Sequence, residues 1–312
     1  MRDHGFFCVI NHGYTPEQTA RIFDIADVPF SQVSEADKKV YEATIQKTGS
    51  YQGFKLRKYW HIENGVRDEV EHYNINHDVT RREHPEALRP FIPEIKEFAR
   101  HNHEDILHPI LRLLAIGLEL PEDTLVKFHN HSAVGETDVR FMKYYPRSKE
   151  DELKSKNVWL KGHTDFGSIT ILYSQPVAGL QILTRNGTWK WVKHIENALV
   201  INAGDALQLL SGGYYQATIH RVIQPPPDQR QYGRLGVFYF SMPDDNVTLA
   251  PLVESPVLQR AGLMKLADGV KPPTMVAWRQ ERTRTYGQIE LKAAGNGVEE
   301  EIIQGVVVKH YN

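Results

Sequence analysis

Apolar residues follow a helical spacing up to about residue 130 and a strand-like spacing after it. The helical pattern is clearest at 93–118, where apolar residues recur every three or four positions and Pro109 is expected to introduce a kink. Thr15 followed by Pro16 has the form of an N-cap with proline at the first helical position, and this helix is predicted to end before Pro29. Two further segments predict strands: 6–10 as a buried strand and, mixed with loops, the aromatic-rich segment 49–77.

Between residues 138 and 243 the pattern changes to short apolar runs punctuated by Gly and Pro. The pair Asn186-Gly187 stands between two of these runs and predicts a tight hairpin. So many short strands in a row are typical of a barrel or a jelly-roll sandwich. The predicted strands are 139–145, 168–173, 180–183, 188–192, 198–202, 219–224 and 235–241.

The last part of the chain predicts an amphipathic helix at 274–288 and strands at 297–310. We therefore divide the chain into a mainly helical region at 1–130, a β core at 131–245 and an extension at 246–312. No repeat or flexible linker separates these parts, and we expect them to form one compact unit.

Charge and cysteine content exclude several classes of protein. The 37 Lys and Arg residues nearly balance the 39 Asp and Glu residues, and no block of like charges suggests a nucleic-acid or membrane partner. One cysteine rules out an internal disulfide framework, and no apolar run is long enough to cross a bilayer. These features predict a cytoplasmic protein with neither a nucleic-acid nor a membrane partner. We expect a monomer or weak homodimer.

The strongest chemical signal lies at His163 and Asp165. A His-x-Asp pair alone is weak, and a second one occurs at His103 and Asp105. Residues two apart on a strand point to the same side, whereas residues two apart on a helix diverge. Because the second pair falls in the predicted helix at 93–118, only His163 and Asp165 are expected to share a metal ion.

His220 supplies a third donor from a distant predicted strand. Two imidazoles and one carboxylate on one side of a metal leave coordination positions open. This set is typical of oxygen-activating non-haem Fe(II) rather than of structural zinc. We therefore predict that His163, Asp165 and His220 are both the metal ligands and the catalytic centre.

Several ordered motifs resemble those of the 2-oxoglutarate- and Fe(II)-dependent oxygenases of the isopenicillin N synthase-like group, which includes plant gibberellin and flavonoid oxidases. The resemblance spans about residues 5 to 245. Its motifs are Gly5-Phe-Phe-x-Val-Ile-Asn-His-Gly, His163-Thr-Asp165-x-Gly-x-Ile-Thr, Gly179-Leu-Gln, Asn202-Ala-Gly-Asp205, His220-Arg-Val and Arg234 with Phe240 and Pro243.

The resemblance implies an α+β protein whose core is a double-stranded β-helix, a cupin-like jelly roll, with helices packed outside it. It also implies an oxidoreductase of the dioxygenase type that binds Fe(II), 2-oxoglutarate and O2, with ascorbate in support. A small organic substrate, of specialised metabolism, would be hydroxylated, desaturated or cyclised, with succinate and CO2 as co-products. Arg234 would hold the distal carboxylate of 2-oxoglutarate, and a planar guanidinium suits that task.

Two positions depart from the family pattern. Gly236 stands where the family usually has a serine that also binds this carboxylate, and Lys143 stands where the family usually has an asparagine. Tyr145 keeps the phenol expected to touch the co-substrate. On a strand Lys143 and Tyr145 would share a face, so we predict that Lys143 partly compensates for Gly236 in the co-substrate site.

Substrate contacts are harder to predict, because buried aromatic residues usually belong to the core. The helix at 274–288, with Trp278, is a candidate lid over the site. Two other functions remain open at this point: an isopenicillin N synthase-like Fe(II) oxidase that does not use 2-oxoglutarate, and a non-catalytic cupin-like binding protein. The candidate substrate contacts are Phe166, Tyr73, Tyr51, Phe238 and Phe240.

Overall fold

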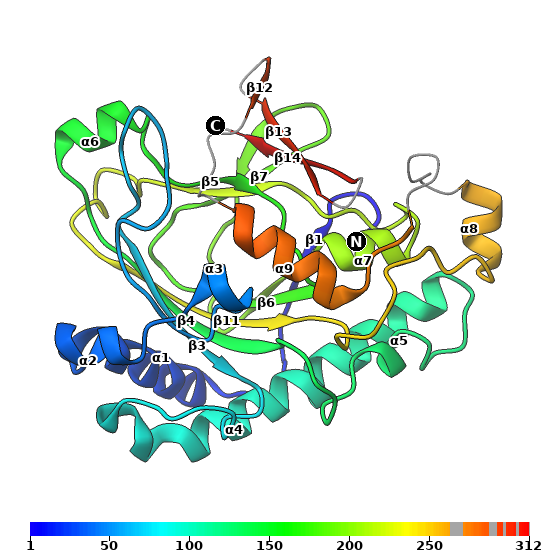
Figure 1. Cartoon of the computed structure of the whole chain (residues 1–312), viewed down its shortest axis with the longest axis horizontal. Helices are drawn as coiled ribbons and strands as arrows, with labels where there is room; N and C mark the ends of the chain where they lie inside the picture. The colour runs from blue at the N-terminus through cyan, green and yellow to red at the C-terminus, as the bar shows by residue number, and fades with distance from the viewer. Residues whose placement is uncertain (263–270, 287–291, 296–297, 304–305, 312) are drawn as a thin grey trace.

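The computed structural model describes residues 1–262, 271–286, 292–295, 298–303 and 306–311. Two antiparallel sheets of seven strands each form a jelly roll (Figure 1). The first sheet has the order β1 (Phe6–Val9), β9 (Leu199–Ala203), β6 (Ile169–Tyr173), β11 (Arg234–Ser241), β4 (Asp138–Tyr144), β3 (Val70–Asn76) and β2 (Gly53–Lys55). The second has the order β12 (Lys292–Gly295), β13 (Val298–Ile303), β14 (Val306–Tyr311), β5 (Val158–His163), β10 (His220–Ile223), β7 (Leu180–Leu183) and β8 (Trp189–Trp191).

The strands predicted in the β core at 131–245 are present in the structure, which contains one more there. Each run predicted between residues 138 and 243 forms a strand, and the Asn186-Gly187 turn joins β7 to β8. Strand β5, which ends at His163, was not predicted. Strands β1, β2 and β3 come from residues 1–130 and join the same sheet as four strands of the 131–245 segment.

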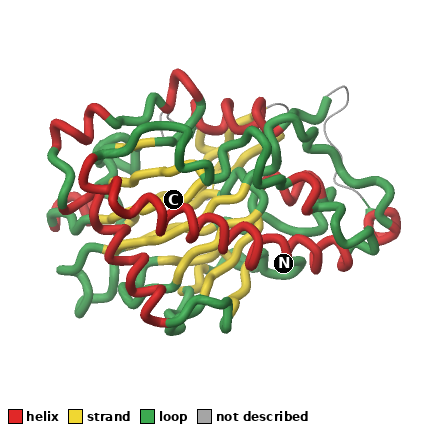
Figure 2. The backbone as a smooth tube through the Cα atoms, turned by 90° about the horizontal axis from the view of Figure 1, so that it is seen from below, coloured by secondary structure: helices red, strands yellow, loops and turns green. Residues whose placement is uncertain are grey.

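Helices cover the outer face of the first sheet. Helix α1 (Pro16–Ser31) contacts β4 and β11, and a long helical run crosses beneath the strands (Figure 2). This run comprises α4 (Ile92–His101), a π-helical turn and α5 (His108–Gly117). Shorter helices are α2 (Glu35–Val40), α3 (Ile45–Thr48), α6 (Lys149–Lys154), α7 (Asp205–Leu210) and α8 (Pro256–Ala261). Helix α9 (Met275–Thr285) contacts α3 and β13.

Pro29 and Pro109 affect their helices differently from the prediction. Helix α1 continues through Pro29 to Ser31, because a proline in the last turn removes only one hydrogen bond before the helix ends. Pro109 stands at the start of α5, directly after the π-helical turn at Asn102–Leu107. The extra residue in that turn changes the hydrogen-bond register just before the proline that lacks an N–H. None of the described helices is both long and apolar enough to span a membrane.

The first sheet has one face toward the helices and one toward the second sheet. On strand β3, Tyr73 faces the helices, packs in the core with Phe54 and Phe98, and hydrogen-bonds His84 Nδ1 through its hydroxyl at 2.8 Å. Its neighbours on the strand, His72 and Asn74, therefore face the space between the sheets. The prediction that Tyr73 contacts substrate is wrong for this reason.

Asp138 at the start of β4 makes folding depend on pH. It is buried and accepts a 2.8 Å hydrogen bond from Asn74 Nδ2. Burial raises the pKa of Asp138 to about 7, although nearby Arg140 lowers it. An unfolded aspartate titrates near pH ~4, so between about pH 4 and about pH 7 the folded state holds an extra proton. Stability is therefore lost as pH rises through this window.

Asp138→Asn is expected to remove this pH dependence, because asparagine can still accept the hydrogen bond from Asn74 but cannot ionise. Urea unfolding should give nearly equal stabilities for the two proteins at pH 5. At pH 8 the variant should be more stable by about 3 kcal/mol, because about two pH units of the window lie above pH 5. A stability difference that is the same at both pH values would contradict the raised pKa.

Candidate active site

Three side chains from separate elements converge between the sheets. His163 ends β5, Asp165 lies in the following loop and His220 begins β10, where it pairs directly with His163. The Nε2 atoms of both histidines lie 3.8 Å from Asp165 Oδ1. All three donor atoms lie within 4.8 Å of one another, and no other described group of His, Cys, Asp and Glu forms such a cluster. The structure thus brings together the three residues that the sequence singled out.

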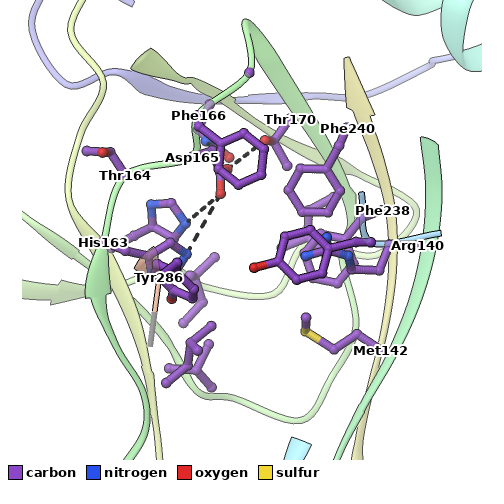
Figure 3. A pocket seen from close by; sticks show the side chains of 18 of the residues that line it. Arg140, Met142, His163, Thr164, Asp165, Phe166, Thr170, Phe238, Phe240 and Tyr286 are labelled. Carbon is purple, nitrogen blue, oxygen red and sulfur yellow. Dashed lines mark hydrogen bonds and ion pairs between the residues drawn. The ribbon is translucent and has the colours of Figure 1, made fainter. Parts of the chain in front are cut away.

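Hydrogen bonds fix how these donors point. Nδ1 of His163 donates to the carbonyl of Lys161 at 2.8 Å, and Nδ1 of His220 donates to the carbonyl of Thr218 at 3.1 Å. Each ring therefore turns toward the centre its Nε2, which is the atom free to bind a metal when the ring is neutral. Oδ2 of Asp165 accepts from Thr170 Oγ1 at 2.6 Å and from Asn202 Nδ2 at 2.8 Å, as the dashed lines in Figure 3 show for Thr170. Oδ1 is left facing the two imidazoles.

Asp165 is buried, and burial alone would raise its pKa. In the metal-free site, positive charge on the His220 and His163 rings and the hydrogen bonds from Thr170 and Asn202 outweigh burial and lower the pKa of Asp165. The carboxyl group is therefore ionised at neutral pH, as a metal ligand must be. Two neutral imidazoles and one carboxylate fit a divalent iron ion and leave room for further ligands.

Glycines let the loop that carries Asp165 pack backbone against backbone. A Cβ on Gly167 would collide with the carbonyl oxygen of Ser241, and one on Gly204 would collide with that of Gly167. This close packing lets the backbone N–H of Asp205 donate to the carbonyl of Asp165 at 2.7 Å. The glycines of both motifs are thus needed to hold the carboxylate in place.

Arg234, the first residue of β11, lines the same cavity and is only 4% exposed. Its Nε donates to the carbonyl of Val177 at 3.2 Å, and its guanidinium lies over the ring of Tyr144. No carboxylate of the described residues forms an ion pair with it. Burial lowers the pKa of Arg234, but a guanidinium stays charged. A buried cation without a counter-ion is costly, so this end of the cavity is suited to an anionic ligand.

Comparison with known proteins decides the family. The 2OG-Fe(II) oxygenase superfamily matches residues 136–243, and the family described as non-haem dioxygenase in morphine synthesis N-terminal matches residues 1–94. Flavanone 3-dioxygenase 2 from Oryza sativa subsp. japonica is 30% identical over 80% of this chain and 69% of that protein. The chain belongs to the 2OG-Fe(II) oxygenase superfamily.

Solved structures agree with this assignment. The structure of JOX2 in complex with 2OG, Fe, and JA is 25% identical, covers 92% of this chain and 79% of that chain, and has a TM-score of 0.67. That of dioxygenase for auxin oxidation 1 from Arabidopsis thaliana, in complex with 2-oxoglutarate, is 19% identical, covers 87% of this chain and 91% of that chain, and shares the fold with a TM-score of 0.64. The protein is therefore a 2-oxoglutarate- and Fe(II)-dependent dioxygenase that acts on a small substrate, as the sequence predicted.

In this oxygenase Tyr144, and not Tyr145, faces the cavity. Tyr144 pairs with Arg234 across β4 and β11, and paired residues of neighbouring strands point to the same side. The hydroxyl of Tyr145 instead donates to Glu71 Oε2 at 3.1 Å outside the cavity. The cavity tyrosine was thus predicted one residue too late, because the family motif was aligned on the proline that follows Tyr145.

Lys143, two residues before Tyr145, also lies outside the cavity. Its Nζ pairs with Oδ1 of Asp27 in helix α1 at 2.6 Å, with the side chains 24% and 38% exposed. The lysine therefore ties the helix to the outer face of β4 and does not reach the cavity. The prediction that it compensates for Gly236 is wrong.

Lys143→Ala is expected to leave the affinity for 2-oxoglutarate unchanged. The half-exposed ion pair to Asp27 contributes at most about 1 kcal/mol to folding. Isothermal titration with 2-oxoglutarate should give the wild-type dissociation constant, and urea unfolding should show only this small loss. An affinity that falls tenfold would instead place the lysine in the co-substrate site.

Gly236 has a neighbour that explains its lack of a side chain. A Cβ at this position would lie 2.5 Å from Cε2 of Phe238, whose ring stacks on that of Phe240 at 5.3 Å. The ring of Phe238 thus fills the space that a serine side chain would use. A serine here would have to displace Phe238, and with it part of the cavity wall.

Four of the five predicted substrate contacts line the cavity. Phe166, Tyr51, Phe238 and Phe240 line the cavity, whereas Tyr73 does not. Sequence reasoning missed four further aromatic or basic residues of the cavity wall, because their positions far from the metal motifs gave no signal. These are Phe6, Trp60, Arg140 and Tyr286.

Helix α9 contacts the site differently from the prediction. Trp278 is fully buried in a separate core cluster. The residue that reaches the cavity is Tyr286, just after the helix, whose ring lies 5.6 Å from that of His163 (Figure 3). Nη2 of Arg282 also donates to the carbonyl of Thr164 at 3.0 Å, next to Asp165. The helix is therefore fixed to the ligand loop.

Proposed function

We propose that His163, Asp165 and His220 hold the Fe(II) ion and that Arg234 binds the distal carboxylate of 2-oxoglutarate. The observation that carries this assignment is the buried charge of Arg234, which no carboxylate of the described residues compensates, in the same cavity as the three donors. A carboxylate would supply the missing counter-charge and accept two parallel hydrogen bonds from the guanidinium. Tyr144 lies beneath the guanidinium and takes the role expected of Tyr145.

The chain's own part in the reaction is to orient and to exclude water. Thr170 and Asn202 hold one oxygen of Asp165, so that the other faces the ion. Apolar side chains such as Leu160, Leu172 and Val222 line the wall and keep the cavity dry. When bound, iron supplies the oxygen chemistry, and 2-oxoglutarate is consumed to succinate and CO2. Hydroxylation of a C–H bond is the outcome we propose, on a small organic compound of specialised metabolism.

Absorption spectroscopy under nitrogen tests the proposal. Adding Fe(II) and then 2-oxoglutarate to the metal-free protein should produce a visible charge-transfer band, and Arg234→Met should require a far higher 2-oxoglutarate concentration to produce it. Succinate release in air, with ascorbate present, should follow. No band and no succinate would favour a binding protein, and substrate oxidation without succinate would favour an oxidase that does not use 2-oxoglutarate.

A further inference from the structure

A second arginine, Arg140 of β4, lines the cavity on the wall that faces His163 and Asp165 (Figure 3). Its guanidinium carbon lies 4.5 Å from the ring centre of Phe240 and 5.1 Å from that of Tyr51. Aromatic rings that hold a guanidinium in this way favour its charged form without supplying a counter-ion. The arginine is thus held by aromatic packing in the wall of the site.

No acidic side chain in the described part of the chain compensates this charge directly. Among the described residues, the one hydrogen bond of Arg140 runs from Nε to Asn74 Oδ1 at 2.9 Å, and no ion pair is formed. Asn74 in turn donates to Asp138 at 2.8 Å, so a neutral amide separates the arginine from that carboxyl group. Asn74 therefore fixes the guanidinium through Nε and leaves its two terminal amino groups available.

Arg140 and Arg234 lie at different levels of the cavity, with their guanidinium groups over Phe240 and Tyr144 respectively. Arg140 pairs with Phe238, whereas Arg234 stands four residues earlier on the same strand. Four strand positions correspond to about 13 Å along the sheet. The cavity thus has two cationic ends, with Leu160, Leu172 and Leu180 among its apolar residues and Phe166, Phe238 and Tyr286 among its aromatic ones.

We propose that Arg140 binds a carboxylate of the substrate and that the enzyme acts on apolar or aromatic monocarboxylic acids. This inference rests on the proposed function, in which Arg234 is reserved for 2-oxoglutarate. A planar guanidinium edge matches a planar carboxylate through two parallel hydrogen bonds. The aromatic and aliphatic walls suit a ligand with a single charge, because each further charge would have to be desolvated without a partner.

The test compares acids with their neutral esters. The iron-loaded protein is titrated under nitrogen, with and without 2-oxoglutarate, with phenylacetate, trans-cinnamate and octanoate and with the methyl ester of each. At least one acid should bind, and about tenfold or more tightly than its ester, as expected for one charge-assisted pair. In Arg140→Met and Arg140→Gln this preference should fall to about twofold or less, with the 2-oxoglutarate affinity unchanged.

Controls separate this inference from the proposed function. Arg230→Met removes an exposed arginine outside the cavity and should keep both the acid preference and the affinity for 2-oxoglutarate. An ester that binds as tightly as its acid, no binding by any acid at millimolar concentration, or an acid preference that survives in both Arg140 variants would each overturn the inference. So would a loss of 2-oxoglutarate affinity in the Arg140 variants. A wild-type protein that fails to bind 2-oxoglutarate would overturn the proposed function instead.

Discussion

Asp165→Ala is expected to abolish Fe(II) binding and to lower 2-oxoglutarate turnover by on the order of a thousandfold or more. Asp165 supplies the one anionic donor of the three, and its Oδ1 lies 3.8 Å from both histidine Nε2 atoms. Without it, two neutral imidazoles remain, which neither balance the charge of the ion nor complete three coordination positions. Iron content after anaerobic loading and desalting measures the first effect, and succinate release measures the second.

Asn202→Ala provides the matched comparison. It keeps all three donors and removes the 2.8 Å hydrogen bond to Asp165, together with a longer one, at 3.4 Å, to the carbonyl of Ala203. Loss of such a supporting hydrogen bond typically costs ~10- to 100-fold in metal affinity or activity. At Fe(II) about a hundredfold above its dissociation constant, the wild-type protein should gain ~2.7 kcal/mol of stability, whereas Asp165→Ala should gain none. If both variants bound iron equally well, Asp165 would not be a ligand.

The pattern of apolar runs was sufficient to predict the fold, because each sheet is buried on one or both sides. Runs of Val, Ile, Leu and aromatic residues between Gly and Pro marked nearly every strand of the jelly roll. Strand β5 was not predicted, because its apolar run Val158–Leu160 is short and is followed by Lys161 and Gly162. The three clustered donors could be picked out because two of them are close in sequence. Asp165, however, lies in the loop after β5 and not on a strand with His163, so the predicted strand geometry is not what brings this pair together.

Register was the part that local sequence could not decide. Tyr144 and Tyr145 are chemically equal, and only pairing with β11 determines which of them faces Arg234. A shift of one residue moves every side chain of a strand to the opposite face. The same rule explains Tyr73, because its neighbours His72 and Asn74 are the residues that face the cavity side. Arg140 and Tyr286 were not predicted as cavity residues, because their positions there depend on tertiary contacts.

Arg234→Met is expected to separate stability from function. In the ligand-free protein the guanidinium is buried, and within the described residues no carboxylate pairs with it. A methionine of similar length avoids the desolvation of that charge, so the ligand-free variant should be as stable as the wild type or more so. Its affinity for 2-oxoglutarate should fall by about 100-fold or more, because two charge-assisted hydrogen bonds are lost.

Two further variants sharpen the result for Arg234. Arg234→Lys keeps the positive charge but loses the planar fork, and its affinity for 2-oxoglutarate should lie between those of the wild type and Arg234→Met. Arg230→Met removes a nearby arginine that is exposed and does not line the cavity, so its affinity should equal that of the wild type. Isothermal titration and thermal unfolding of the ligand-free proteins give both quantities. A methionine variant that unfolds earlier yet binds 2-oxoglutarate normally would mean that the buried arginine serves the fold and not the co-substrate.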